Sequence, residues 1–357
     1  MSSTKTFKIV VLPGDGIGPE VTEQALKLLP VIGKNENVEF LLDEGLIGAI
    51  AIDQTGNPLP DETIEKCKDS DAVLLGAVGH PKYDMDPTAK VRPEQGLLKI
   101  RKSLGLFANI RPVKTYPVLD PISPLKDHLL IGVDFVVFRE LTGGIYFGEK
   151  GRSEDGTEAW DHCNYSVNEI ERIARMAFET AGKRRKKLTL VDKANVIETS
   201  RLWRETVQKM APEYNDISLD FMFVDNAAMQ IILQPSFFDV ILTENMFGDI
   251  ITDEASVITG SIGLLPSASV GEGTALFEPI HGSAPQIAGK DIANPFATIL
   301  SLAMMMDQFG LRDSAEHIRG IVSDALDKGM VTGDISPENP KRTSEVGDWV
   351  YKQMSAT

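Results

Sequence analysis

Cysteine is scarce in this sequence, and its scarcity excludes several classes of protein. Only Cys67 and Cys163 occur among 357 residues, and the five histidines are scattered along the chain. Two cysteines outside a CxxC pattern cannot build a disulfide framework or a soft-metal cluster. We therefore expect a reducing compartment, with the cytoplasm as the default.

Excess positive charge and long hydrophobic runs are also lacking. The net charge of -16 disfavours a nucleic-acid partner and an anionic membrane surface. No apolar run approaches the roughly 20 residues of a membrane-spanning helix, and the N-terminal segment carries no signal or transit pattern. The basic run KRRKK at 183–187 follows a helical pattern. A solvated helix end is favoured there over a nucleic-acid patch, because cations stabilise the negative end of the helix dipole.

The standard phosphate-binding motifs are missing as well. No Walker sequence occurs, and VVLPGDGIGPE places Gly14, Gly16 and Gly18 in a GxGxG spacing instead of GxGxxG. Pro19 and Glu20 stand where a pyrophosphate would need bare backbone N–H groups. The turn alone fits a ligand loop and a simple strand-to-helix turn about equally.

The sequence does contain a pattern typical of an α/β protein. Hydrophobic residues make up 42% of the chain, enough for a large core in two domains or one elaborate domain. Short apolar runs alternate with helical patterns, which predicts a largely parallel sheet. The stretch from about 260 onwards is expected to be helical, with loops rich in glycine and proline. Residues 147–166 suit an exposed hairpin arm, although an unstructured loop fits as well.

Two carboxylates follow the apolar run DVILT, which reads as a buried strand. Asp249 and Asp253 are four residues apart, on one face of an expected helix. Like charges about 4 Å apart repel by roughly 4 kcal/mol at a surface-like dielectric, so they need wide spacing, solvation or a cation. Asp225 follows another strand, and three aspartates without histidine or thiolate point to Mg²⁺ or Mn²⁺.

Arginines stand near these acids along the predicted sheet. Arg111 and Arg139 are expected at strand ends, where open α/β sheets bind ligands. In RPEQGLLKIR, Arg101 shares a helix face with Glu94, Leu97 and Leu98. Guanidinium groups bind carboxylates in bidentate fashion, so three arginines together would select a dicarboxylic or tricarboxylic acid. Each arginine alone is better explained by a structural salt bridge.

Two further residues could transfer protons, and one loop could hold a flat ligand. Tyr146 follows two glycines and Lys193 follows a strand; either could be an acid or base if its pKa is lowered. The segment LFEPIHGSAPQIAGKDIANPFATI is rich in small residues and could approach a ligand closely. A ligand-free Ω-loop is the alternative.

Together these segments resemble the β-decarboxylating dehydrogenases, the family of 3-isopropylmalate and isocitrate dehydrogenases. The resemblance runs in order through GDGIGPE, RPEQGLLKIRKSLGLFANIRPVK, RELTGGIYFG, DKANV, VDNAAMQ, ENMFGDIITDEAS and EPIHGSAP. It implies an isopropylmalate dehydrogenase-like two-domain α/β fold, with a large mixed sheet flanked by helices and not of the Rossmann type. Residues 1–107 and 260–357 would form a cofactor domain. Residues 108–259 would form a substrate, metal and dimerisation domain with the hairpin arm.

The resemblance also implies roles for individual residues. Seven would contact a dicarboxylate substrate: Glu94, Leu97, Leu98, Arg101, Arg111, Arg139 and Asp225. Leu97 and Leu98 stand where isocitrate enzymes carry polar residues, which favours an isopropyl branch.

The implied chemistry needs a metal ion, a proton acceptor and a proton donor. Asp225, Asp249 and Asp253 would ligate Mg²⁺ or Mn²⁺. Lys193 would help remove the C2 hydroxyl proton, and Tyr146 would protonate C3 after CO₂ leaves. Lys193 and Asp225 would reach the site from the second subunit of a homodimer.

The cofactor would be NAD. Its implied contacts are Gly14, Ile17, Glu278, His281, Gly282, Ser283, Ala284, Gln286 and Asn294. Relatives that use NAD usually carry Asp where Gln286 stands. Gln286 can bond a ribose hydroxyl but supplies no charge against a 2′-phosphate, so NADP is the second choice.

We predict NAD-dependent oxidative decarboxylation of 3-isopropylmalate to 4-methyl-2-oxopentanoate and CO₂ in leucine biosynthesis. The same chemistry on D-malate, tartrate or homoisocitrate is the nearest alternative. A non-catalytic regulatory subunit of the same fold is another, although Lys193 and Tyr146 are both retained. A metal-dependent hydrolase would leave the arginines without a role.

Overall fold

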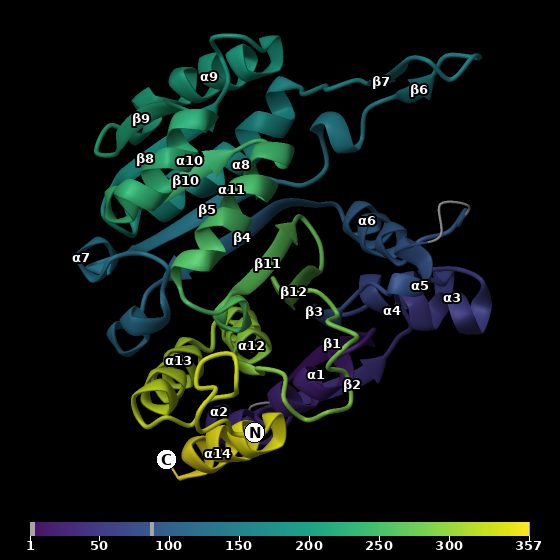
Figure 1. Cartoon of the computed structure of the whole chain (residues 1–357), viewed down its shortest axis with the longest axis vertical. Coiled ribbons are helices and arrows are strands. Elements are labelled where there is room, and N and C mark those ends of the chain that lie inside the picture. The colour runs from purple at the N-terminus through teal and green to yellow at the C-terminus, as the bar shows by residue number, and fades with distance from the viewer. Residues whose placement is uncertain (1–3, 86–88, 357) are drawn as a thin grey trace. The chain divides into compact units, whose positions relative to one another are not determined.

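The chain folds into two compact units. The computed structural model describes residues 4–85 and 89–356. Unit 1 comprises Met1–Leu106 with Ser261–Thr357, and unit 2 comprises Phe107–Gly260. Ten strands of the mixed main sheet divide evenly between them (Figure 1). Each unit therefore has its own strands, helices and core.

Unit 1 carries five strands in the order β2-β1-β3-β12-β11. They are β1 (Lys5–Gly14), β2 (Val38–Glu44), β3 (Ala72–Ala77), β11 (Pro266–Gly271) and β12 (Ala275–Pro279). All neighbours are parallel except β11 and β12. The helices are α1 (Gly18–Leu26), α2 (Leu29–Glu36), α3 (Ala49–Thr55), α4 (Asp61–Lys68), α5 (Pro81–Asp84), α6 (Pro93–Ser103), α12 (Phe296–Phe309), α13 (Arg312–Asp327) and α14 (Thr343–Ser355).

Helices cover the strands of unit 1 on both faces. Helices α1 and α12 pack against β1, β3, β11 and β12. On the other face, Leu12 and Leu75 share a core cluster with Ile64 of α4 and Ile100 of α6. A strand buried on both faces needs apolar residues at successive positions, as in the fully buried AVLLGA of β3.

Unit 2 carries the other five strands in the order β4-β5-β10-β8-β9. They are β4 (Leu106–Lys114), β5 (Asp134–Glu140), β8 (Lys187–Asp192), β9 (Ser218–Phe223) and β10 (Val240–Thr243). Only β4 and β5 are antiparallel. The helices are α7 (Asp127–Leu130), α8 (Val167–Gly182), α9 (Glu198–Met210), α10 (Val224–Leu233) and α11 (Asn245–Ile258). A separate hairpin of β6 (Lys150–Arg152) and β7 (Ala159–Asp161) projects from unit 2 (Figure 1).

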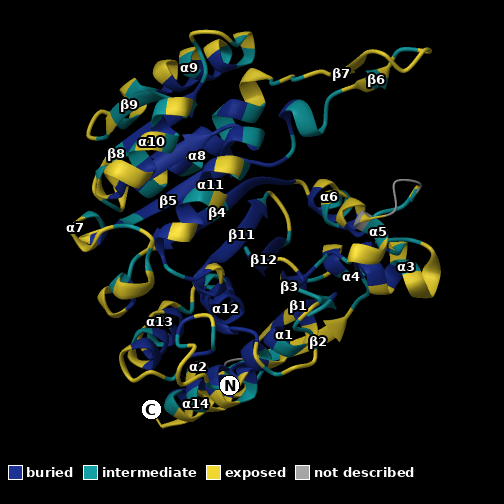
Figure 2. Cartoon of the chain, in the orientation of Figure 1, coloured by how far each residue is buried: buried dark blue, intermediate teal, exposed yellow. Residues whose placement is uncertain are grey.

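The strands of unit 2 are also covered on both faces. Helix α8 packs against β5, β8 and β10. On the opposite face Val137, Val191 and Ile241 share a cluster with Ile231 of α10 and Ile251 of α11. Figure 2 shows the inner strands β5, β8 and β10 as buried between helices whose outer sides are exposed. Helix α11 therefore packs directly on β5 and β10.

The predicted α/β class with a large mixed sheet is confirmed, and one expectation was wrong. The stretch from about 260 is not helical throughout, because it contributes β11 and β12 before the helices begin. These strands were missed because PSASVG contains only one β-branched residue and ALFEP is short. Burial in the sheet, with no exposed residue in either strand, overrides the weak local preference.

Basic side chains of the run at 183–187 form ion pairs within unit 2. Arg184 Nε lies 2.8 Å from Asp239 Oδ1, and Lys186 Nζ lies 2.9 Å from Asp216 Oδ2. These ion pairs support the structural reading of the run.

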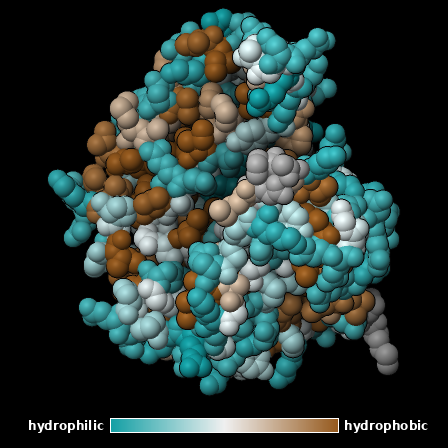
Figure 3. All heavy atoms as spheres, turned by 45° about the vertical axis from the view of Figure 1, so that its right-hand side comes forward, coloured by the Kyte–Doolittle hydropathy of each residue, from teal (hydrophilic) through white to brown (hydrophobic). Residues whose placement is uncertain are grey.

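Hydrophobic groups lie among hydrophilic ones over the face shown in Figure 3. Within the part of the chain that is described, no helix is both long and apolar enough to cross a membrane.

Candidate active site

Two arginines and an asparagine share one face of the β4–β5 ladder in unit 2. Asn109 of β4 is paired with Arg139 of β5, and Arg111 follows two residues later. Paired residues, and residues two apart, point to the same side of a sheet. The expectation that Arg111 ends its strand was wrong, because β4 continues to Lys114. Arg111 lies on the same face of the sheet as Arg139, because the antiparallel register pairs Asn109 with Arg139 and Arg111 is two residues further along β4. The two arginines are not brought together by the ends of two strands.

Helix α11 lies over this face and supplies acceptors to both arginines. Arg139 Nη1 pairs with Asp249 Oδ1. Arg111 Nη1 donates to Thr252 Oγ1 at 2.6 Å and lies 3.4 Å from Asp253 Oδ1. The arginine side chains are 5% and 9% exposed, whereas Asp253 is 70% exposed. The expected helix that carries Asp249 and Asp253 is confirmed as α11, and the guanidinium groups offset the repulsion between the two aspartates.

Gly248 allows the helix to approach Arg139 closely. A Cβ at this position would lie 2.6 Å from Arg139 Cγ and 3.0 Å from Thr243 Cγ2. Contacts below 3.0 Å require atoms to move, and these atoms belong to the root of a buried side chain. The glycine is thus part of how the arginine is placed beneath α11.

Tyr146 joins the same group from the 3₁₀ turn Gly144–Tyr146. Its hydroxyl donates to Asp249 Oδ2 at 2.9 Å. Burial, reinforced by the Asp249 charge, raises the pKa of Tyr146 above its ordinary value. The condition set from the sequence, a lowered pKa, is not met. A phenol that stays protonated at neutral pH is suited to giving a proton rather than taking one.

Lys193 and Asp225 form a separate pair at the far edge of unit 2. Lys193 follows β8 and Asp225 lies in the first turn of α10. Lys193 Nζ is 2.6 Å from Asp225 Oδ1, and the ammonium lowers the pKa of that carboxyl. The Asp225 side chain is 64% exposed, so the pair faces outward and can be approached from outside the subunit.

The donors for a metal ion are hard oxygens, as Mg²⁺ and Mn²⁺ prefer. In residues 4–85 and 89–356 no group of three His, Cys, Asp or Glu side chains could hold a metal. Asp249 and Asp253 supply two carboxylates one helical turn apart. Mg²⁺ is often bound by one or two carboxylates, with water and substrate completing its shell. The aspartates of α11 fit such an ion.

In unit 1, the predicted substrate residues lie on and around α6. Arg101 is buried, and its Nη2 donates to Glu278 Oε1 of β12 at 2.7 Å. Leu97 packs against the core of the unit, whereas Leu98 is 37% exposed. Glu94 is exposed at the start of the helix. Helix α6 therefore carries an exposed acid and an exposed apolar group, together with an arginine in a buried ion pair.

The glycine turn after β1 and the small-residue loop after β12 are brought together in unit 1. Gly14 and Gly16 both have positive φ, and a Cβ on Gly16 would lie 1.9 Å from Ser283 O. The Ile17 amide donates to the same oxygen at 2.8 Å. Ala284 packs against the cluster that contains Ile17. Two segments more than 260 residues apart in sequence numbering thus form one surface.

His281 supplies a buried atom that this surface leaves unsatisfied. Its Nδ1 lies 3.0 Å from Gly282 O, and within the described residues its buried Nε2 has no hydrogen-bond partner. Burial lowers the pKa of His281, so the ring is neutral. If Nδ1 carries the proton, Nε2 is an acceptor for a hydroxyl or amide. Gly282 and Gln286 of the same loop are exposed.

Asn294 lies at the far end of this loop and has other partners. Its Nδ2 donates to Asp334 Oδ2 at 3.0 Å, and its Oδ1 accepts from the Phe296 amide at 3.0 Å. In this arrangement Asn294 holds the start of α12 and would contribute to a cofactor mainly through its position.

Sequence reasoning missed several residues that hold the site side chains and the glycine turn in place. Asn109, Thr252 and Asn245 accept from the site arginines, and Asp15 accepts from the amides of Ala49, Ile50 and Gly79. Asp15 could have been found, because an acid inside a tight glycine turn has to bond to something. The asparagines give no signal until strand register is known.

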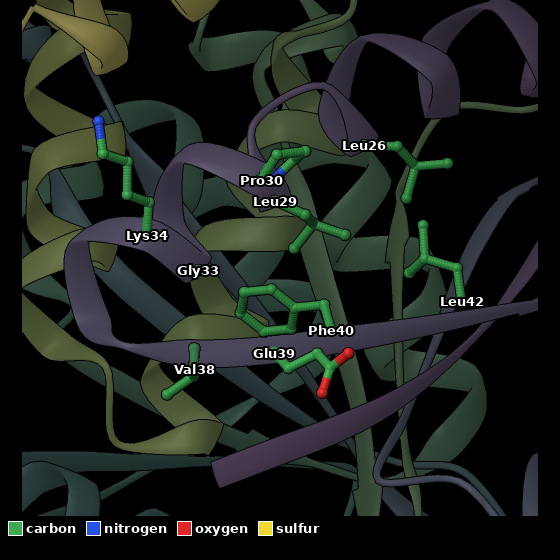
Figure 4. Close-up of a pocket in the computed structure, with 9 residues that line it drawn as sticks. All are labelled: Leu26, Leu29, Pro30, Gly33, Lys34, Val38, Glu39, Phe40 and Leu42. Carbon is green, nitrogen blue, oxygen red and sulfur yellow. The ribbon is translucent and has the colours of Figure 1, made fainter. Parts of the chain in front are cut away.

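An apolar groove of unit 1 lies elsewhere. It has a volume of about 430 Å³ and is lined mainly by aliphatic and aromatic groups of α1, α2 and β2, with Lys34 and Glu39 (Figure 4). None of the predicted site residues lines it.

Comparison with known proteins identifies the family of this chain. The model of the isocitrate/isopropylmalate dehydrogenase family matches residues 8–350. A 3-isopropylmalate dehydrogenase of Bacteroides fragilis is 54% identical over 96% of this chain and 98% of its own. Another from Aquifex aeolicus is 52% identical over 98% of both. The crystal structure of isocitrate dehydrogenase from Methylococcus capsulatus superimposes with a TM-score of 0.88 at 34% identity, covering 98% of this chain and 99% of that one. The chain belongs to the isocitrate/isopropylmalate dehydrogenase family.

Proposed function

We propose that this protein oxidises and decarboxylates 3-isopropylmalate, with NAD as hydride acceptor, in leucine biosynthesis. Family membership and relatives of that name at 52–55% identity support the reaction. The observation that carries the proposal is the group on unit 2. Arg111 and Arg139 lie beneath Asp249, Asp253 and Tyr146. Cations for a carboxylate, hard ligands for a metal and a proton donor are thus within one cluster.

The two arginines would bind a carboxylate of the substrate. Both are buried and held by fixed acceptors, so little side-chain entropy is lost on binding. A cation at Asp249 and Asp253 would take over part of the negative charge that now faces the arginines. The Nη1 groups of Arg111 and Arg139, which now face α11, could then donate to the substrate while each guanidinium keeps its orientation.

A divalent cation, when bound, would polarise the C2 oxygen and stabilise negative charge that develops on it. The chain's own groups handle the protons. Tyr146, which stays protonated, is proposed to deliver a proton to C3 after CO₂ departs. Lys193 is proposed to help remove the C2 hydroxyl proton as hydride leaves for the nicotinamide.

The cofactor is proposed to lie on unit 1, over the glycine turn and the loop that contains His281. The unsatisfied Nε2 of His281 and the open space at Gly282 support this placement. Gln286 is exposed beside them and adds no charge. We therefore propose NAD over NADP, with weaker selectivity than an aspartate would give. Arg101, Leu97, Leu98 and Glu94 are proposed to surround the remaining carboxylate and the alkyl branch.

A second copy of the chain is proposed to complete the site. Lys193 and Asp225 face outward as a pair, and neighbouring helices expose apolar groups. On α10 these are Met229, Ile232 and Leu233, and on α11 they are Ile250 and Val257, all 41–59% exposed. Their spacing of three, four and seven residues puts each set on one helix face. Clustered exposed apolar residues are typical of interfaces, which supports a homodimer.

The cytoplasmic location stays a prediction.

The test is absorbance at 340 nm with purified protein, Mg²⁺ and either NAD or NADP. Parallel reactions contain 3-isopropylmalate, D-malate, tartrate, homoisocitrate and isocitrate. We expect selective NADH formation with 3-isopropylmalate, abolished by EDTA and restored by Mg²⁺. Faster turnover of another acid would reassign the substrate. No reduction with any acid would favour the regulatory subunit.

A further inference from the structure

Asn245, the first residue of α11, is a buried polar residue whose side-chain oxygen and nitrogen are both hydrogen-bonded. It is 1% exposed. Its Oδ1 accepts from Nε and Nη2 of Arg139, at 3.1 and 2.8 Å. Its Nδ2 donates to Gly143 O at 3.2 Å, and its backbone amide donates to Tyr165 Oη at 2.9 Å. An asparagine bonded on both sides has one orientation only.

The oxygen side of Asn245 fixes the direction of Arg139. The Nε–Nη2 edge of the guanidinium faces Asn245, and Nη1 faces Asp249. Because the guanidinium is planar and rigid, two fixed edges determine the direction of the whole group. The aliphatic part of the same side chain lies close to Gly248, where a Cβ would not fit.

The nitrogen side of Asn245 fixes the turn that carries Tyr146. Gly143 is also held at its amide, which donates to the buried carboxylate of Glu140 at 2.7 Å. The next residue, Gly144, begins the turn that ends at Tyr146. Both polar groups of the Gly143 backbone are thus bonded to side chains of the same unit. The Tyr146 hydroxyl then reaches Asp249 at 2.9 Å.

We propose that Asn245 is a positioning residue that sets Arg139 and Tyr146 in one common geometry around Asp249. The inference rests on the proposed function, in which Arg139 binds the substrate and Tyr146 gives a proton. Asn245 itself touches neither substrate nor cofactor. It couples the carboxylate-binding group to the proton donor, so the two cannot move independently.

The two sides of the amide can be separated by substitution. Asn245→Asp keeps an oxygen for Arg139 but removes the N–H that holds Gly143 O. Asn245→Ala removes both. Asn109→Ala is the matched control, because this second buried asparagine accepts from Arg111 Nε at 2.7 Å on the same face.

Steady-state kinetics with 3-isopropylmalate should divide these variants. We expect Asn245→Asp to lower kcat on the order of 100-fold, because a misplacement of about 1 Å can cost that much. Its KM should stay within about threefold of the wild-type value, since Arg139 keeps an acceptor. Asn109→Ala should raise KM with a smaller effect on kcat. Asn245→Ala should change both parameters.

Amide hydrogen exchange of the ligand-free protein gives a readout that does not depend on activity. The Gly144 and Phe147 amides donate to Asn164 O and Gly144 O, at 3.0 and 3.2 Å. Both Asn245 variants should speed their exchange about fivefold, as expected for losing a hydrogen bond of about 1 kcal/mol. Asn109→Ala should leave these amides as in the wild type.

Wild-type kcat in Asn245→Asp, or a loss of kcat without faster exchange at 143–148, would overturn the proposal. If Asn245→Ala does not fold, the comparison of Asn245→Asp with the wild type still decides it. If the wild type oxidises none of the acids, the proposed function fails. The exchange of the Tyr146 turn then still tests whether Asn245 holds it.

Discussion

At the scale of single residues, Gly248 is a position where the site arginine leaves no room for a side chain. In Gly248→Ala the new Cβ would meet Arg139 Cγ at 2.6 Å and Cβ at 2.8 Å. Alanine favours helix by about 1 kcal/mol over glycine, but overpacking a buried contact typically costs about 1–3 kcal/mol. We expect no net stabilisation and at least a tenfold rise in KM, measured by thermal unfolding and steady-state kinetics.

The control is Gly320→Ala on α13. A Cβ there would have no atom within 4 Å. This variant should be stabilised by about 1 kcal/mol, with KM unchanged. If both glycine variants gain equal stability and keep the wild-type KM, the close approach of α11 to Arg139 has no consequence.

Glu244 is a second residue with a measurable consequence, here in pH dependence. It is 6% exposed, and burial raises its pKa to about 7. Since the folded pKa exceeds the unfolded one, the folded state holds the proton more tightly. Its contribution to stability is therefore full at low pH and is lost as pH rises through about 7. The loss is at most on the order of 3 kcal/mol, because one pKa unit corresponds to about 1.4 kcal/mol.

Glu244→Gln should remove this dependence. The amide keeps an oxygen for the Ser200 hydroxyl, which donates to Glu244 Oε1 at 2.7 Å, and it carries no charge. We expect the free energy of unfolding in urea to fall less between pH 5 and pH 8 than in the wild type. Glu205→Gln, at an exposed position, is the control. A pH profile identical to the wild type would show that Glu244 is ionised at little cost.

Charge and spacing predicted which residues gather at the site better than they predicted how those residues are held. The sequence led to Arg111, Arg139 and Asp249 because charged groups beside apolar strands need a reason. It could not lead to Asn245 or Thr252. An uncharged side chain bonds whatever the fold brings near it, and that depends on the register of β4 and β5.

At the scale of elements, β2 is an edge strand whose acidic residues are expected to prevent it from pairing with a strand of another chain. It pairs only with β1 in the sheet order, and Leu41 and Leu42 are 46% and 50% exposed. Edge strands with exposed apolar groups invite pairing with another chain, and charges oppose it. Glu39 supplies such a charge at the groove in Figure 4, and Asp43 and Glu44 supply two more at the end of the strand.

Removing the charges should therefore cause association through β2. We expect the double variant Glu39→Thr/Asp43→Thr to form species larger than the wild-type assembly, seen by light scattering after size exclusion. Glu179→Gln/Glu205→Gln removes the same charge from helices α8 and α9 and should keep the wild-type size. Equal association in both double variants would point to net charge and not to the strand edge.

Elements were predictable where periodicity was strong. The helix at 244–256 and the strand DVILT followed directly from pattern, whereas β11 and β12 did not. Their small residues suit close packing under α12, which no local window reveals. Arg111 shows the same limit, because its place on the site face depends on β4 running antiparallel to β5. Direction within a sheet is set by tertiary connections.

At the scale of the whole molecule, the proposed dimer makes each site depend on two chains. Lys193 and Asp225 would serve the partner, whereas Asp249 would serve its own subunit. Two defects can then compensate each other, provided that they lie in different chains.

Mixing two inactive variants tests the dimer directly. Lys193→Ala and Asp249→Asn should each lose nearly all activity. In a mixed dimer, the Lys193→Ala chain keeps Asp249 and would receive Lys193 from its partner, so one of the two sites is intact. Random reassortment makes about half of the dimers mixed, which restores about a quarter of wild-type activity. The measurement is NADH formation after the two variants are unfolded together and refolded. If each site used only its own chain's residues, every site would carry a defect and the mixture would stay inactive.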